Sequence, residues 1–192
     1  MKRIFLLSLI ILLTLSSISF ANSNLKTYEN TEFNFEISYP QEWTVDITDI
    51  PAAEKFFQRK IGSLMVTMSP LKGWNYIGVI VIKSDKPILG DPYTDEYLNP
   101  LIARVTEPLL GAKPDLISKS MVTVNGMKAM KTTVYLKKGA LLGESSELQD
   151  ETYFIFHNNF WYEISLGGNP AYLKDNRKQY DESLNSFKFL SE

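Results

Sequence analysis

The chain has 192 residues, of which 44% are hydrophobic and 22% charged, a balance that argues against a wholly disordered protein. Its 20 basic and 22 acidic side chains give a formal net charge of -2, so no bulk electrostatic attraction to nucleic acid is expected. Cysteine is absent from the sequence, which excludes disulfides, thiol chemistry and cysteine-based zinc sites.

The first 21 residues have the three parts of a secretory signal peptide. Lys2 and Arg3 make a positive start, and residues 4–13 are apolar apart from one serine. Ser19 and Ala21 then place small side chains at the −3 and −1 positions of a cleavage site. We expect export with cleavage after Ala21. The alternative is an uncleaved N-terminal anchor, for which the apolar stretch is short.

The first half of the mature chain predicts strands and one short helix. Residues 33–39 alternate apolar and polar side chains, the period of a half-buried strand, and Pro40 ends the pattern. Residues 49–57 favour a short helix with Asp49 as its N-cap. Residues 64–68 alternate again, whereas residues 76–82 are apolar on both faces and predict a strand covered on both sides.

Two later helices are expected where asparagine precedes proline. Asn99-Pro100 suits an N-cap followed by the first helical position, and apolar residues recur at helical spacing as far as Leu109. Asn169-Pro170 repeats the pair before a C-terminal helix with an apolar face. Residues 187–190 are expected to pack the chain end back onto the sheet.

Two β-hairpins are expected between these helices. Residues 121–124 and 127–136 flank Asn125-Gly126, the strongest short hairpin pattern, because both residues tolerate positive φ. Residues 152–156 and 160–166 flank a second turn.

The order of these elements predicts an α+β protein. Consecutive hairpins imply antiparallel pairing, and a strand that is apolar on both faces needs cover on both sides. We therefore expect a twisted antiparallel β-sheet flanked by helices, with residues 137–150 as a polar loop between the hairpins. A single domain is expected over residues 22–192, after the signal peptide at residues 1–21.

Three motifs carry a resemblance to a known family. Residues 35–43 read Phe-Glu-Ile-Ser-Tyr-Pro-Gln-Glu-Trp, Val124-Asn125-Gly126 forms a hairpin after the central helix, and a helix runs through residues 184–189. On these motifs the chain resembles the PsbP-like superfamily, including its bacterial extracytoplasmic members, from about Tyr28 to Leu190. The resemblance implies an αβα sandwich and a non-enzymatic role in binding or assembling protein partners.

The chain departs from the photosynthetic members of that superfamily. Those proteins dock on the lumenal face of photosystem II through an N-terminal extension and basic surface residues. Here cleavage would remove two basic residues from a chain of net charge -2, so the mature chain is more acidic still. Few residues precede the first predicted strand. The resemblance therefore does not carry a photosystem role to this chain.

No catalytic residue, metal site or cofactor is expected from the sequence. His157 is the only histidine, and we expect it to be an exposed turn residue, since no nucleophile motif accompanies it. Asp91, Asp95 and Glu96 are the densest acidic group but lack the spacing of a calcium loop. They are expected to form a solvated loop and helix start, where acidic side chains favourably meet the helix dipole.

Aromatic side chains give the candidate interaction surface. Trp74 is expected in a loop, and Trp161 is a candidate only if no helix covers its face of the strand. The full set of candidates is Trp74, Tyr76, Tyr93, Tyr97 and Trp161.

The sequence leaves more than one function open. The first hypothesis is an exported, non-enzymatic binding or assembly module whose partner is an envelope or secreted protein. The alternative is a secreted hydrolase, or a binder of a small ligand or glycan, with acidic and aromatic residues in a cleft. A purely structural envelope protein is a third possibility. In each case no nucleic acid partner and no transmembrane span in the mature chain are expected.

Overall fold

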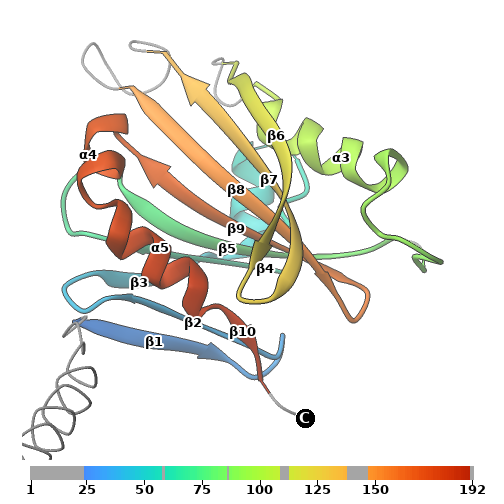
Figure 1. The fold of residues 1–192 in the computed structure, drawn as a ribbon, viewed down its shortest axis with the longest axis horizontal. Helices are drawn as coiled ribbons and strands as arrows, with labels where there is room; N and C mark the ends of the chain where they lie inside the picture. Colours follow the sequence, from blue (N-terminus) through green and yellow to red (C-terminus); the bar gives the residue numbers. More distant parts are fainter. Residues whose placement is uncertain (1–23, 58, 86, 109–112, 138–146, 191–192) are drawn as a thin grey trace, which may run out of the picture.

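A computed structural model describes residues 24–190, except for residues 58, 86, 109–112 and 138–146 (Figure 1). The predicted signal peptide therefore lies outside the described residues, as does the predicted helix end at Leu109. Along the described chain, no helix combines the length and the apolar character that crossing a bilayer requires.

The larger of two β-sheets has seven strands in the order β3-β4-β5-β9-β8-β7-β6, and every neighbouring pair is antiparallel. Its strands are β3 (Thr44–Ile47), β4 (Leu64–Ser69), β5 (Tyr76–Lys83), β6 (Asp115–Val124), β7 (Met127–Leu136), β8 (Leu148–His157) and β9 (Phe160–Gly168). The predicted strands are confirmed, and β5 lies inside the sheet, as its apolar faces require.

The smaller sheet was not predicted. It consists of β1 (Leu25–Asn30), β2 (Phe35–Pro40) and β10 (Lys188–Phe189) in the order β1-β2-β10. β1 was not predicted because half of its side chains are exposed and the others only half-buried, so the strand lacks a clear alternation of apolar and polar residues. β10 pairs with β2, which confirms that the chain end returns to a sheet.

The helices enclose the larger sheet. They are α2 (Ile50–Phe57), α3 (Asp95–Thr106), α4 (Pro170–Asp175) and α5 (Arg177–Ser186). α3 packs on one face, whereas α4, α5 and the smaller sheet pack on the other (Figure 1). The protein therefore has the predicted α+β architecture, an antiparallel sheet between helical layers.

Helix α3 begins earlier than predicted. Thr94 is its N-cap, so Pro100 lies inside the helix and not at its first position. The earlier start lets Leu98 join Leu101 against the sheet, where both side chains are buried. One missing backbone donor at the proline is offset by this apolar burial. Asp95 and Glu96 occupy the first turn, as expected of acids near a helix N-terminus.

The C-terminal helix starts as predicted but is interrupted. The Asn169 side chain accepts a hydrogen bond from the Ala171 backbone N–H at 3.0 Å, and Pro170 occupies the first turn. Asn176, with φ −106° and ψ 18°, separates α4 from α5.

Both predicted hairpins are confirmed. Asn125 and Gly126 have φ of 44° and 79°, and Asn158 and Asn159 have φ of 47° and 65°. β8 begins at Leu148, however, so the end of the predicted polar loop is strand.

Phe35 joins the two sheets. Its side chain is 0% exposed, and its ring centroid lies 5.6 Å from that of Phe187, 5.9 Å from that of Tyr162 and 6.0 Å from that of Tyr28. One aromatic side chain of β2 thus contacts the larger sheet, the segment after α5 and the neighbouring strand.

Replacing this ring is expected to destabilise the fold. Phe35→Ala should lower the free energy of unfolding by about 3–5 kcal/mol, since it leaves a cavity between the sheets. Urea denaturation followed by circular dichroism measures the change. Leu89→Ala is the control, because Leu89 is 86% exposed and its loss should cost less than about 0.5 kcal/mol. Equal costs for the two variants would contradict this account of the core.

Candidate functional site

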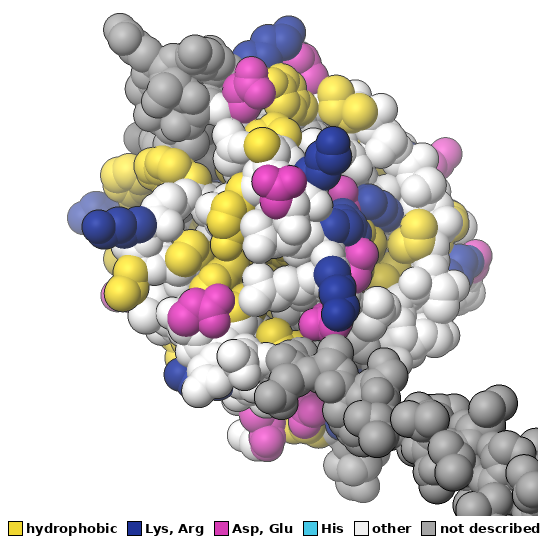
Figure 2. Space-filling view, turned by 60° about the vertical axis from the view of Figure 1, so that its left-hand side comes forward, with side chains coloured by type: hydrophobic (Ala, Val, Ile, Leu, Met, Phe, Trp, Pro, Cys, Tyr) yellow, Lys and Arg dark blue, Asp and Glu magenta, His cyan; other side chains and the backbone are white. Residues whose placement is uncertain are grey.

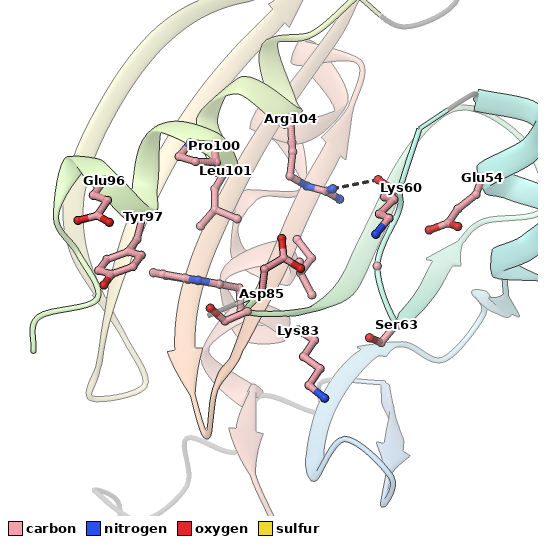
Figure 3. A pocket seen from close by; sticks show the side chains of 14 residues that line it. Glu54, Lys60, Ser63, Lys83, Asp85, Glu96, Tyr97, Pro100, Leu101 and Arg104 are labelled. Atoms are coloured by element: carbon pink, nitrogen blue, oxygen red, sulfur yellow. Dashed lines mark hydrogen bonds between the residues drawn. The ribbon is translucent and has the colours of Figure 1, made fainter. Parts of the chain in front are cut away.

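An open cleft of about 720 Å³ lies between α3, the end of β5 and the segment that enters β4 (Figure 3). This volume falls in the range of small-molecule sites, about 300–1,000 Å³. The lining residues are Glu54, Lys60, Gly62, Ser63, Ile82, Lys83, Ser84, Asp85, Glu96, Tyr97, Pro100, Leu101, Arg104 and Trp161.

One face of α3 forms a wall of the cleft. Glu96, Tyr97, Pro100, Leu101 and Arg104 recur at intervals of three and four residues, the spacing that aligns side chains along one side of a helix. Figure 3 shows these side chains projecting from α3 above those of β5. The amphipathic helix therefore supplies both the cover of the sheet and the wall of the site.

Arg104 ties α3 to the segment that enters β4. Its Nη1 donates to the Lys60 carbonyl at 3.0 Å, and its Nη2 donates to the Ile61 carbonyl (Figure 3). In the other direction, Arg59 Nη1 donates to the Arg104 carbonyl at 3.0 Å. These reciprocal hydrogen bonds fix one end of the cleft.

A buried glutamate lies beside this arginine. Glu163 of β9 is 6% exposed, and its Oε2 lies 3.8 Å from Arg104 Nε. Among the described residues, neither of these two atoms has a hydrogen-bond partner. Burial raises the pKa of Glu163 to about 7, and the charge on Asp150 adds to the rise, although Arg104 and Arg59 oppose it. The carboxyl thus titrates near neutral pH.

Asp150 is a second carboxyl on the same sheet face, and it is half-buried. It accepts hydrogen bonds from the Tyr76 hydroxyl and, at 2.6 Å, from Thr152 Oγ1. Burial raises its pKa, although these hydrogen bonds oppose the rise. The Tyr76 ring packs so closely on β9 that a Cβ on Gly167 would lie 2.2 Å from its Cζ. Tyr76 is therefore half-buried, with its hydroxyl turned toward the sheet.

Three of the five predicted aromatic residues meet beneath α3. The rings of Tyr93 and Trp161 pack edge to face at 5.6 Å, and Tyr97 lines the cleft with Trp161. The Tyr93 hydroxyl accepts from the Phe156 backbone N–H at 3.1 Å and donates to the Lys128 carbonyl. Trp161, a candidate only if no helix covers its face of the strand, does not meet that condition. It is 4% exposed, because α3 covers its strand face.

Trp74 lies apart from the cleft. It is 58% exposed in the loop between β4 and β5, at the other end of β5 from Asp85. The structure therefore divides the predicted aromatic set into three residues beneath α3, Tyr76 at the start of β5, and Trp74 in the loop before it.

The lone histidine is not an exposed turn residue. His157 ends β8, is half-buried, and stacks on the Phe189 ring with centroids 3.8 Å apart. Asp91 and Asp95, considered above for calcium, pair with Lys128 at 3.0 Å and Lys119 at 3.2 Å. Over the described ranges, no group of three or more histidine, cysteine, aspartate or glutamate side chains is placed to hold a metal ion.

Sequence reasoning missed Arg104, Asp150 and Glu163. Glu163 did carry a signal, because it is the one charged residue in the otherwise mainly apolar strand β9. A carboxyl at such a position must be buried, and buried carboxyls with raised pKa values often mark functional sites. Asp150 carried no such signal, since it was assigned to the polar loop.

Comparison with solved structures identifies the fold. Cyanobacterial PsbP from Synechocystis sp. PCC 6803 superposes with a TM-score of 0.61 at 15% identity, over 89% of this chain and 95% of that one. The chain has the PsbP-like fold. The Ran-binding protein Mog1p of Saccharomyces cerevisiae shares it, with a TM-score of 0.52 at 11% identity over 88% of this chain and 97% of Mog1p.

A Bacteroides thetaiotaomicron protein also shares the PsbP-like fold, with a TM-score of 0.54 at 11% identity, over 87% of this chain and 49% of that one. No protein-family model matches the sequence, and no curated protein sequence matches it. At these identities the likeness concerns the fold alone.

The buried carboxyl makes stability depend on pH. The pKa of Glu163 is about 7 in the folded protein and near 4.5 when unfolded. Its contribution to stability is thus complete below about pH 4.5 and is lost as pH rises through 7. A shift of this size corresponds to roughly 3 kcal/mol. Glu163→Gln should therefore raise the free energy of unfolding at pH 8 and flatten its decline between pH 4.5 and 7 in urea titrations.

Glu151 provides the matched control. It is also buried, on the neighbouring strand, but accepts hydrogen bonds at 2.7 Å from both Lys131 and Arg177. Burial would raise its pKa, yet these partners hold it below the usual value. Glu151→Gln should therefore destabilise the protein at pH 8. The same sign of change for both variants would contradict the assignment of Glu163.

Proposed function

We propose that this protein is an exported, non-enzymatic binding module and that the cleft beside α3 is its contact site. The observation that carries the proposal is the composition of the cleft: Tyr97 and Trp161 line a concavity that also holds side chains of both charges. Aromatic side chains at the centre of a partly charged surface are typical of binding hot spots.

The charges around the cleft favour a polypeptide partner. Lys60 and Lys83 contribute positive charge, and Glu54, Asp85 and Glu96 contribute negative charge. A lining of mixed sign does not suit the uniformly anionic backbone of a nucleic acid. It suits an extended segment of an envelope or secreted protein, which presents its own charges of both signs around an apolar side chain.

Two further features support binding over catalysis. Glu163 is 6% exposed, and Asp150 accepts hydrogen bonds from Tyr76 and Thr152. The His157 ring stacks on Phe189, so all three titratable side chains are engaged within the fold. The solved structures of this fold include a protein described as Ran-binding. The fold accommodates protein binding in that case, although identity is too low to transfer the partner.

A small-ligand or glycan-binding protein, or a secreted hydrolase, is the second candidate. Asp85 and Glu96 share the cleft with Tyr97 and Trp161, a combination of acidic and aromatic side chains that sugars commonly contact. The volume of about 720 Å³ also suits a small ligand. This candidate predicts that a soluble oligosaccharide changes the fluorescence of Trp161, whereas the polypeptide proposal predicts no change.

Export makes its own prediction. N-terminal sequencing of the protein recovered from the envelope or medium should begin at Asn22, because Ala21 completes the expected cleavage site. An intact Met1 would show that the leader is retained as an anchor.

Site-specific crosslinking tests the cleft. A photoreactive phenylalanine analogue at Tyr97, which lines the cleft, should crosslink one discrete envelope or secreted protein in cells. The same analogue at Tyr172 of α4, outside the cleft, is the positional control and should not.

Charge reversal sharpens the crosslinking experiment. Lys83→Glu in the cleft should reduce the Tyr97 crosslink about tenfold, since it places repulsion against the partner. Lys26→Glu, at another exposed lysine, on β1, should leave the yield unchanged. Equal crosslinking from Tyr97 and Tyr172, or insensitivity to Lys83→Glu, would refute the proposed contact site.

A further inference from the structure

The loop between β4 and β5 exposes two large apolar side chains close together. Leu71 is 84% exposed and Trp74 is 58% exposed, with the exposed Lys72 between them. The other tryptophans, Trp43 and Trp161, are each 4% exposed. A single exposed apolar residue needs no explanation, but a leucine and a tryptophan on one short loop form an apolar tip.

The base of this loop is fixed to the body of the protein. Asn75 Oδ1 accepts a hydrogen bond from the Asn169 backbone N–H at 3.2 Å, next to the start of α4. Tyr76 follows, with its ring packed against Gly167. The apolar tip is therefore held outward by an anchored strand end.

The chain enters the fold at the same end of the molecule. The Gln41 backbone N–H donates to the Asn24 carbonyl at 2.7 Å, and Thr44 pairs with Ser69, the residue before the loop. Two residues separate Gln41 from Thr44, a reach of about 10 Å. Figure 2 brings this end forward and shows hydrophobic side chains at the surface among basic and acidic ones.

The apolar sequence before Asn24 indicates that this end of the molecule lies near a membrane during export. Residues 4–13 are the apolar part of the predicted leader, which enters the membrane during export. Only ten residues separate them from Asn24, which allows a span of at most about 40 Å. While the leader is attached, the end that carries Leu71 and Trp74 is therefore held close to the bilayer.

We propose that the loop of Leu71, Lys72 and Trp74 is a membrane-contact surface. Leu71 and Trp74 enter the interface of a lipid bilayer, and Lys72 stays at the level of the headgroups. Tryptophan suits this position because its ring is apolar and its N–H is polar, and lysine extends its charge toward the water. Two apolar side chains give weak, reversible contact, so the loop orients the protein on a membrane and does not anchor it.

This contact is separate from the proposed binding function. β5 runs from Tyr76, next to the loop, to Lys83 in the cleft, a length of about 26 Å for eight residues. The loop and the cleft thus lie at opposite ends of one strand, and either site can fail its test without affecting the other.

Trp74 provides a selective probe, because the other two tryptophans are buried. The experiment uses the exported chain, and in parallel the chain that retains its leader, with vesicles of phosphatidylethanolamine and phosphatidylglycerol. Vesicles should shift tryptophan emission to shorter wavelength and protect it from aqueous acrylamide, and brominated acyl chains should quench it. Trp74→Phe should abolish all three responses while the protein stays folded.

Two exposed leucines, Leu71 in the loop and Leu89 outside it, allow a test variant to be matched with a control variant. Leu71→Ser should reduce partitioning of the exported chain into the vesicles about tenfold. Leu89→Ser replaces a leucine that is 86% exposed, in the loop that follows the far end of β5, and should leave partitioning unchanged.

Three results would overturn the proposal. One is an unchanged Trp74 environment in both forms of the protein at millimolar lipid, even when the retained leader binds the vesicles. Another is an equal effect of Leu71→Ser and Leu89→Ser. The third is a response to native envelope vesicles but not to pure lipid, which would assign the loop to a protein partner in the membrane.

Discussion

The structure depends on burial of both faces of the central strands of the larger sheet. On one face, Val79 of β5 and Ile164 of β9 pack against α4, α5 and the smaller sheet. On the other face, α3 covers Trp161 but is too short to cover the whole sheet. The cleft lies at the flank of this twelve-residue helix, and Glu54 of α2 lines it as well.

The two buried glutamates, Glu151 and Glu163, differ in how well neighbouring side chains compensate their charge. Glu151 has Lys131, Arg177 and Tyr153 as partners, and the two cations hold its pKa below the usual value despite burial. Glu163 faces Arg104 at 3.8 Å, and within the described part of the chain each of these two side chains keeps a polar atom without a hydrogen-bond partner. Proteins retain such imperfect compensation mostly at functional sites, which agrees with the place of Glu163 beside the cleft.

β5 links the two surfaces that the proposals concern. Its first residues hold the loop of Leu71 and Trp74, and its last residues enter the cleft. Because a strand within a sheet is stiff, a protein that rests on a membrane by the loop holds the cleft about 26 Å away. A partner in the aqueous compartment can then reach it. In this proposal β5 thus sets the distance between the membrane-contact loop and the cleft.

The sequence by itself determined the strands with alternating or uniformly apolar side chains, the hairpin turns at Gly126 and Asn158, and the cap at Asn169, because each depends on local backbone preferences. It did not determine β1, whose side chains show no alternation, or the pairing of β10 with β2, which is non-local. Nor did it determine the start of α3, which burial of Leu98 decided against the local preference of Pro100.

The site was decided by tertiary structure alone. Arg104, Glu163 and Lys60 lie far apart in the chain and meet only because β9 lies beside β5 and α3 crosses above them. The sequence showed which residues of that region are aromatic, but it did not show which of them are buried. The exposure of Trp161, for example, depends on whether a helix covers its strand. Local preferences fix elements, whereas clefts and buried charges arise from how those elements pack.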